Sequence, residues 1–210
     1  MKHLLSFLCL FSAFTINAQR QRTKLAYTTA VNFSPLALLQ TDNTIMLGAE
    51  HRLTKRWAVA TDLGYSFTSY YYGKEIKNAK GFIIRPAVRY YGHSLRGYIQ
   101  AQPFYKMVNY DMNDWLGKDC VNGVHSYEKL EDFRLRKNVY GINFVAGEVL
   151  PVSDKMFFDL YVGFGLRTRT HRILNRFNSC YDRTDDAFSI SDNTWVPSLP
   201  IGIRVGYALR

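Results

Sequence analysis

One segment of the chain, KMFFDLYVGFGLRTR at residues 155–169, alternates between apolar and mixed side chains along most of its length. One row is entirely apolar, and the interleaved row holds glycines and charges such as Asp159 and Arg167. A period of two predicts a β-strand with one apolar face and one polar face. The alternation lasts about eleven residues, whereas a strand of a soluble domain usually stops after about five or six. A tilted strand needs about that length to cross a bilayer, so the apolar row faces either a protein core or lipid.

The same alternation recurs along the chain and predicts eight strands, the other seven being residues 25–33, 45–50, 57–67, 82–90, 98–106, 140–147 and 199–209. Tight turns are expected at 53–56, 92–94 and 151–154, and longer connections at 35–43, 70–80, 110–131 and 172–196. Short turns at one end and long loops at the other are typical of outer-membrane barrels. The predicted fold is an all-β, eight-stranded antiparallel up-and-down transmembrane β-barrel with short periplasmic turns and long extracellular loops.

The polar face of the predicted strands carries charges of both signs beside small residues, which suits the narrow lumen of an eight-stranded barrel. Aromatic residues near the strand ends, among them Trp57 and Trp195, resemble the interfacial girdles of membrane proteins. The alternative is a soluble lipocalin-like barrel with the apolar row inside. Because buried charges need partners, we predict a lumen charge network. Its members are Glu50, Asp62, Arg85, Arg89, Lys106, Asp159 and Arg204.

Residues 1–18 have the layout of a secretory signal peptide, with a basic start, an apolar run and small or polar residues at its end. Residues 19–210 are then expected to form one barrel domain. Cys120 and Cys180, the two cysteines beyond this signal, suggest one disulfide in an exported protein, with two free thiols as the alternative. The net charge is +10. An exported chain meets no nucleic acid, so lipopolysaccharide phosphates are the more plausible counter-ions.

With these features the chain resembles the small eight-stranded outer-membrane barrels of Gram-negative bacteria, of the OmpA-barrel and OmpX type, over residues 24–210. The last strand, PIGIRVGYALR, resembles the signal read by the barrel-insertion machinery, although it ends on Arg210 and not on an aromatic residue. The resemblance implies a place in the cell outer membrane. Its implied partners are the membrane lipid, lipopolysaccharide and, during assembly, the insertion machinery.

We expect no catalysis, no cofactor and no metal, and a structural or surface-interaction role. Two alternatives stay open: a lipid A-modifying barrel enzyme, and a small pore or transporter. The enzyme would need a nucleophile and base near the outer rim, for which His171 with Ser66 or Ser69 and Asp185 is the candidate set. Arg167, Arg169 and Arg172 are candidates for contact with lipopolysaccharide phosphates. The loops at 110–131 and 172–196, tied together by the two cysteines, are candidates for binding an extracellular partner.

Overall fold

The computed structural model describes residues 27–71, 74–76, 78–93, 95–121, 124–176, 179–180 and 193–209. The predicted signal peptide, residues 1–18, lies outside them.

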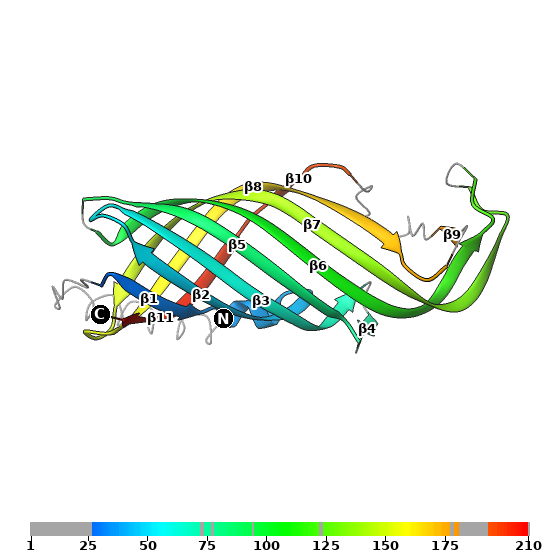
Figure 1. The fold of residues 1–210 in the computed structure, drawn as a ribbon, viewed down its shortest axis with the longest axis horizontal. Helices are drawn as coiled ribbons and strands as arrows, with labels where there is room; N and C mark the ends of the chain where they lie inside the picture. The colour runs from blue at the N-terminus through cyan, green and yellow to red at the C-terminus, as the bar shows by residue number, and fades with distance from the viewer. Residues whose placement is uncertain are drawn as a thin grey trace, which may run out of the picture.

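The chain forms an all-β, closed antiparallel barrel of eight strands (Figure 1). The barrel strands are β1 (Thr29–Phe33), β2 (Asp42–Arg52), β3 (Trp57–Tyr71), β5 (Lys80–Tyr91), β6 (Gly97–Lys118), β7 (Tyr127–Pro151), β8 (Met156–Ile173) and β11 (Ile201–Leu209). The predicted all-β barrel and its strand number are confirmed.

Closure of the barrel is visible in the register of its first strand. Val31 of β1 lies opposite Ala49 of β2 and also opposite Tyr207 of β11. The strands follow one another in chain order from β1 to β7, and β8 joins β7 to β11. A closed ladder leaves no sheet edge within the barrel wall.

The longest strands, β6 and β7, extend beyond the rest of the barrel as a hairpin (Figure 1). The predicted loop at 110–131 is therefore largely wrong, because β6 runs to Lys118 and β7 begins at Tyr127. A separate apolar cluster stabilises this extension. It consists of Ala79, Val108, Tyr110, Leu116, Phe133 and Leu135.

The other long connections contain short elements. The first holds the 3-10 helix η1 (Pro35–Leu39), whose Ala37 packs against the interior side chains Met46 and Ile83. The second holds β4 (Lys74–Ile76), which pairs with β3. The last holds β9 (Ser179–Cys180), on β6, and β10 (Val196–Ser198), on β8. Among the described residues, no helix has the length and apolarity needed to span a membrane.

Candidate functional site

The barrel interior holds a chain of ion pairs contributed by five strands. Arg89 contacts Glu50 at 2.6 Å and Asp159 at 3.3 Å, and Arg204 contacts Asp159 and Asp62, each at 3.0 Å. All five side chains are buried. Cations and carboxylates thus alternate across the lumen from β2 to β3 by way of β5, β8 and β11.

Tyrosine hydroxyls complete the hydrogen bonding of these carboxylates. Tyr98 donates to Asp159 at 2.6 Å and Tyr91 donates to Glu50 at 2.6 Å. The tyrosine rings also lie against the cations: the Arg89 guanidinium is 3.9 Å from the Tyr98 ring centroid, and that of Arg204 is 4.2 Å from the Tyr161 centroid. Buried charges that are paired and hydrogen-bonded in this way avoid the large cost of an isolated buried ion.

Glycines on the interior row make room for these large side chains. A Cβ at Gly202 would collide with the Tyr161 ring, and one at Gly48 would collide with Asp62. The glycines that interrupt the polar rows of the sequence therefore have a steric role.

The predicted lumen residues divide between two heights of the barrel. Lys106 does not join the chain of ion pairs but contacts Asp42 at 2.9 Å, which Lys137 also contacts at 3.1 Å. Arg85 lies opposite Asp62 in the β3–β5 ladder, and its Nε has no hydrogen-bond partner among the described residues. The other five predicted members come together in the chain of ion pairs.

Tyr27 corrects one assignment of the strand faces. The period of two over the predicted strand 25–33 places Tyr27 in the outward apolar row with Val31, but it is only 5% exposed and its hydroxyl donates to Glu50 at 3.1 Å. The chain bends at Thr28, just before β1 begins, so the alternation does not extend back to Tyr27. Tyr27 stacks on Phe157 in an apolar cluster beside the short turns.

The outer wall of the barrel is an apolar belt. Leu47, Leu63 and Ile84 are exposed and are successive cross-strand neighbours on β2, β3 and β5. Thr61 and His51 are polar residues within these rows, and His51 bonds to the Thr29 hydroxyl at 2.9 Å. The belt also includes exposed Val31, Ile45, Val59, Val88, Ile99, Ile142, Phe144, Phe158, Val162, Phe164, Leu166 and Ile201.

Aromatic residues border this belt at both ends. Near the short turns Trp57 packs edge-on against Tyr90, and near the long loops Trp195 packs edge-on against Tyr140. Along β3 the belt runs from Trp57 to Phe67, which at about 3.3 Å per residue and a tilt of about 40° is a height of about 25 Å. The lipid-facing band of outer-membrane barrels has a height of about 25 Å.

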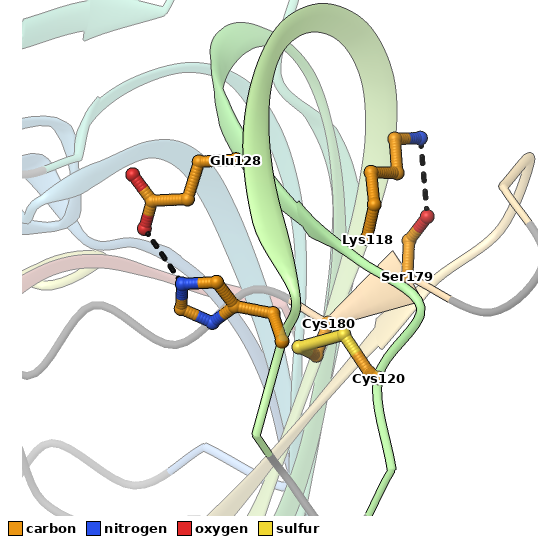
Figure 2. The surroundings of a disulfide bond; sticks show 6 residues. Lys118, Cys120, Glu128, Ser179 and Cys180 are labelled. Carbon is orange, nitrogen blue, oxygen red and sulfur yellow. Dashed lines mark hydrogen bonds and ion pairs between the residues drawn. A yellow bond between two sulfur atoms is a disulfide. The ribbon is translucent and has the colours of Figure 1, made fainter.

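A disulfide clamps the projecting hairpin. Cys120 and Cys180 are bonded, with 6.0 Å between their Cα atoms, and this prediction is confirmed. Figure 2 shows the bond beside Lys118, whose ammonium donates to the Ser179 hydroxyl at 3.2 Å. The same Lys118 ammonium contacts Glu131 at 2.8 Å. β9 is thus held on the hairpin by a covalent bond, a short ladder and polar contacts.

Apolar side chains are exposed on and near the hairpin tip. Val121 and Val124, which pair at the tip, are 70% and 73% exposed, and Trp115, Leu130 and Tyr127 are exposed along the two strands that lead to it. Trp115 lies directly opposite Leu130 in the β6–β7 ladder. Exposed apolar groups gathered in this way often mark a binding surface.

A family model described as "Protein of unknown function (DUF3575)" matches residues 4–209. The chain belongs to this family. No curated protein and no solved structure matches it. The family assignment of this DUF3575 protein therefore names no activity, and its function has to be argued from the barrel itself.

The candidate catalytic residues occupy different surroundings in this DUF3575 barrel. The Ser66 hydroxyl is buried against that of Thr44 at 2.8 Å, and Ser69 donates to Asp42 at 2.6 Å. His171 lies on β8 opposite Lys137. Asp185 lies outside the described residues.

The three predicted lipopolysaccharide-contact arginines do not share one face of β8. Arg167 and Arg169 lie in the lumen-facing row of β8 that also holds Asp159, and they interact electrostatically with Lys106 and Lys137 of the interior. Arg172 lies in the outward row of β8 with Val162 and Leu166, is exposed and lies opposite Arg136.

The prediction from the sequence did not include several residues that line the interior. Asp42 was assigned to a loop and Lys137 to the residues before a strand, although both lie on strands and share the lumen face. Arg52, whose guanidinium lies between the Tyr27 and Tyr91 rings, was missed beside a tight turn. The period of two could have identified them, because each lies an even number of residues from the polar row already assigned in its strand.

The clamp gives a first prediction. Replacing both Cys120 and Cys180 with serine is expected to release β9 from the hairpin. The barrel should stay folded, because its eight strands pair without the disulfide. Trypsin should then cut the hairpin region about tenfold faster, as expected for a local loss of roughly 1.4 kcal/mol. Limited proteolysis followed by mass spectrometry measures this. Equal cleavage rates in the variant and the parent protein would show that β9 stays on the hairpin without the disulfide.

The carboxylate of Glu131 gives a second prediction. Hydrogen bonds from Lys118 and Lys129 lower its pKa from 4.5 to about 2. Because the folded state binds this proton less well than the unfolded state, the stabilisation is complete above pH 4.5 and is lost as the pH falls towards 2. Fluorescence of Trp115, with Trp57 and Trp195 replaced by phenylalanine, should report a transition in this range. The transition should be absent after Glu131→Gln, and its persistence there would assign it to another group.

Proposed function

We propose that this chain is an integral outer-membrane barrel with a structural or surface-interaction role and no catalysis. The observation that carries the proposal is the distribution of side chains across the barrel wall: the exposed outer face is apolar, whereas the interior holds ion-paired Glu50, Arg89, Asp159, Arg204 and Asp62. A soluble barrel has the opposite distribution, because water favours a polar exterior and an apolar core.

The size and borders of the belt support this proposal. Its height of about 25 Å and its aromatic borders match those of a lipid-facing band. The predicted signal at residues 1–18 supports export, and the barrel-insertion machinery would then assemble the chain. In this orientation the short turns are periplasmic and the hairpin of β6 and β7 projects outwards.

The interior favours a barrel that does not conduct over a pore. The chain of ion pairs crosses the lumen, and apolar clusters lie on either side of it, one with Tyr91 and Phe157 and the other with Tyr110 and Phe133. An eight-stranded barrel has an interior just wide enough for side chains. A surface role is favoured by the clamped hairpin, which presents exposed apolar groups at its tip.

The decisive experiment is the gel mobility of the protein in the outer-membrane fraction, with and without boiling. A membrane barrel resists sodium dodecyl sulfate and changes its mobility only when heated. The proposal predicts that the protein is found in this fraction and that its band shifts on boiling. Recovery as a soluble protein, with no shift, would reject it in favour of a ligand-binding barrel.

A further inference from the structure

A row of three basic side chains and one asparagine crosses four strands on the outer face of the barrel. Lys80 of β5, Asn109 of β6, Arg136 of β7 and Arg172 of β8 are successive cross-strand neighbours. Each is an even number of residues from an outward-facing residue of its own strand, so all four share the outer face. We call this set the basic row.

The basic row lies just beyond the aromatic border of the belt. Tyr105 and Tyr140 are cross-strand neighbours at that border, and Arg136 precedes Tyr140 by four residues on β7, on the side towards the hairpin tip. Four residues of a tilted strand rise about 10 Å. Polar headgroups occupy the zone directly outside the hydrocarbon core, which puts the basic row at their level if the belt is in lipid.

The cations of the basic row are not neutralised within the described part of the chain. Arg136 and Arg172 are directly opposite each other, an arrangement that destabilises a strand pair unless an anion lies between the charges. Arg136 donates through Nε to the Asn109 amide oxygen at 2.9 Å, which orients its guanidinium without cancelling its charge. By contrast, Arg134 in the next row contacts Asp111 at 2.8 Å.

The outward pair near the same end of β2 and β3 differs from the basic row. On β2 and β3, near the same end, the cross-strand neighbours Asn43 and Thr68 are uncharged, and their side chains bond to each other at 3.4 Å. Three cations on four adjacent strands, with two of them directly opposite each other, fit a bound anion better than a rim that is merely solvated.

We infer that the basic row binds the phosphate groups of an outer-leaflet glycolipid headgroup, an inference that rests on the proposed membrane function. Guanidinium groups bind phosphate through two parallel hydrogen bonds. Arg136 and Arg172, on strands about 4.8 Å apart, can share one phosphate, and Lys80, about two strand spacings from Arg136, can reach a second. The ligand class is therefore a lipid that carries more than one phosphate, with acyl chains lying on the apolar belt below.

The test compares the binding of lipids to the full chain extracted from membranes in detergent. The double variant Arg136→Gln/Arg172→Gln removes two charges of the basic row. The control Lys55→Gln/Lys155→Gln removes two exposed charges at the short-turn end. Native mass spectrometry would measure binding of bisphosphorylated lipid A, of the same lipid after dephosphorylation, and of inorganic phosphate.

The expected result is an affinity for bisphosphorylated lipid A that falls about tenfold or more in the basic-row variant and stays unchanged in the control. Dephosphorylated lipid should bind the parent protein as weakly as bisphosphorylated lipid binds the variant. Equal binding by variant and parent, or equal binding with and without phosphates, would overturn the inference. Inorganic phosphate binding as tightly as the lipid would also overturn it, because the site would then not select a lipid. The boiling shift is measured on the same samples. A parent protein that shows the shift but binds bisphosphorylated lipid A no better than dephosphorylated lipid would reject this inference and leave the membrane barrel standing.

Discussion

Replacing Arg204 with methionine is expected to lower the free energy of unfolding by about 3–5 kcal/mol. Arg204 is 1% exposed and connects Asp159 to Asp62, each at 3.0 Å. Removing this cation leaves Asp62 without its ion-pair partner inside the barrel and Asp159 with Arg89 alone. The measurement is a urea titration of the folded barrel in lipid vesicles, followed by the mobility shift between unboiled and boiled samples.

Two further variants separate the charge effect from a loss of packing. The triple variant Asp62→Asn/Asp159→Asn/Arg204→Met removes both carboxylates that Arg204 contacts together with the cation and should recover most of the lost stability. Lys55→Met, at an exposed turn, should change the free energy of unfolding by no more than about 0.5 kcal/mol. If Arg204→Met alone changed it as little as Lys55→Met, the chain of ion pairs would not be what stabilises the interior.

Much of this interior could be predicted from the sequence because a strand has a period of two. Once Asp159 and Arg204 were assigned to polar rows, their position inside a closed barrel followed, and so did their need for partners. The sequence does not specify which residues of different strands lie at the same height. This depends on the stagger between strands, which here separates Lys106 from Arg89 and puts it beside Asp42.

The predictions failed where the period of two was broken or disguised. A bend at Thr28 shifts Tyr27 from the expected outer face to the interior. In the β6–β7 hairpin most outward residues, such as Asn113 and Asp132, are polar. The segment therefore has the composition of a loop, although its inward residues Leu116 and Phe133 are apolar. The two faces of a strand in water and of a strand in lipid have opposite polarity. A prediction based on outward apolar residues therefore fails for the parts of strands that extend beyond the apolar belt.

Replacing Val162 with arginine is expected to destabilise the barrel by about 2–4 kcal/mol in vesicles, because a charge at the bilayer midplane has to be taken out of water. Val162 is exposed on the outer wall, near the middle of the outward row of β8. In water the same substitution would replace an exposed apolar side chain with a charged one and change the stability by no more than about 0.5 kcal/mol. The size of the effect therefore tests which solvent surrounds the belt, and the urea titration used for Arg204→Met measures it.

The matched control is Met156→Arg, six residues along the same outward row and at the short-turn end of β8. Near the interface an arginine costs only about 0–1 kcal/mol, because its long side chain can reach the headgroups. A large effect at Val162 with a small effect at Met156 is a dependence on depth, which only a layered solvent produces. Small effects at both positions would mean that water surrounds the belt, and large effects at both would point to a protein partner that covers the whole row.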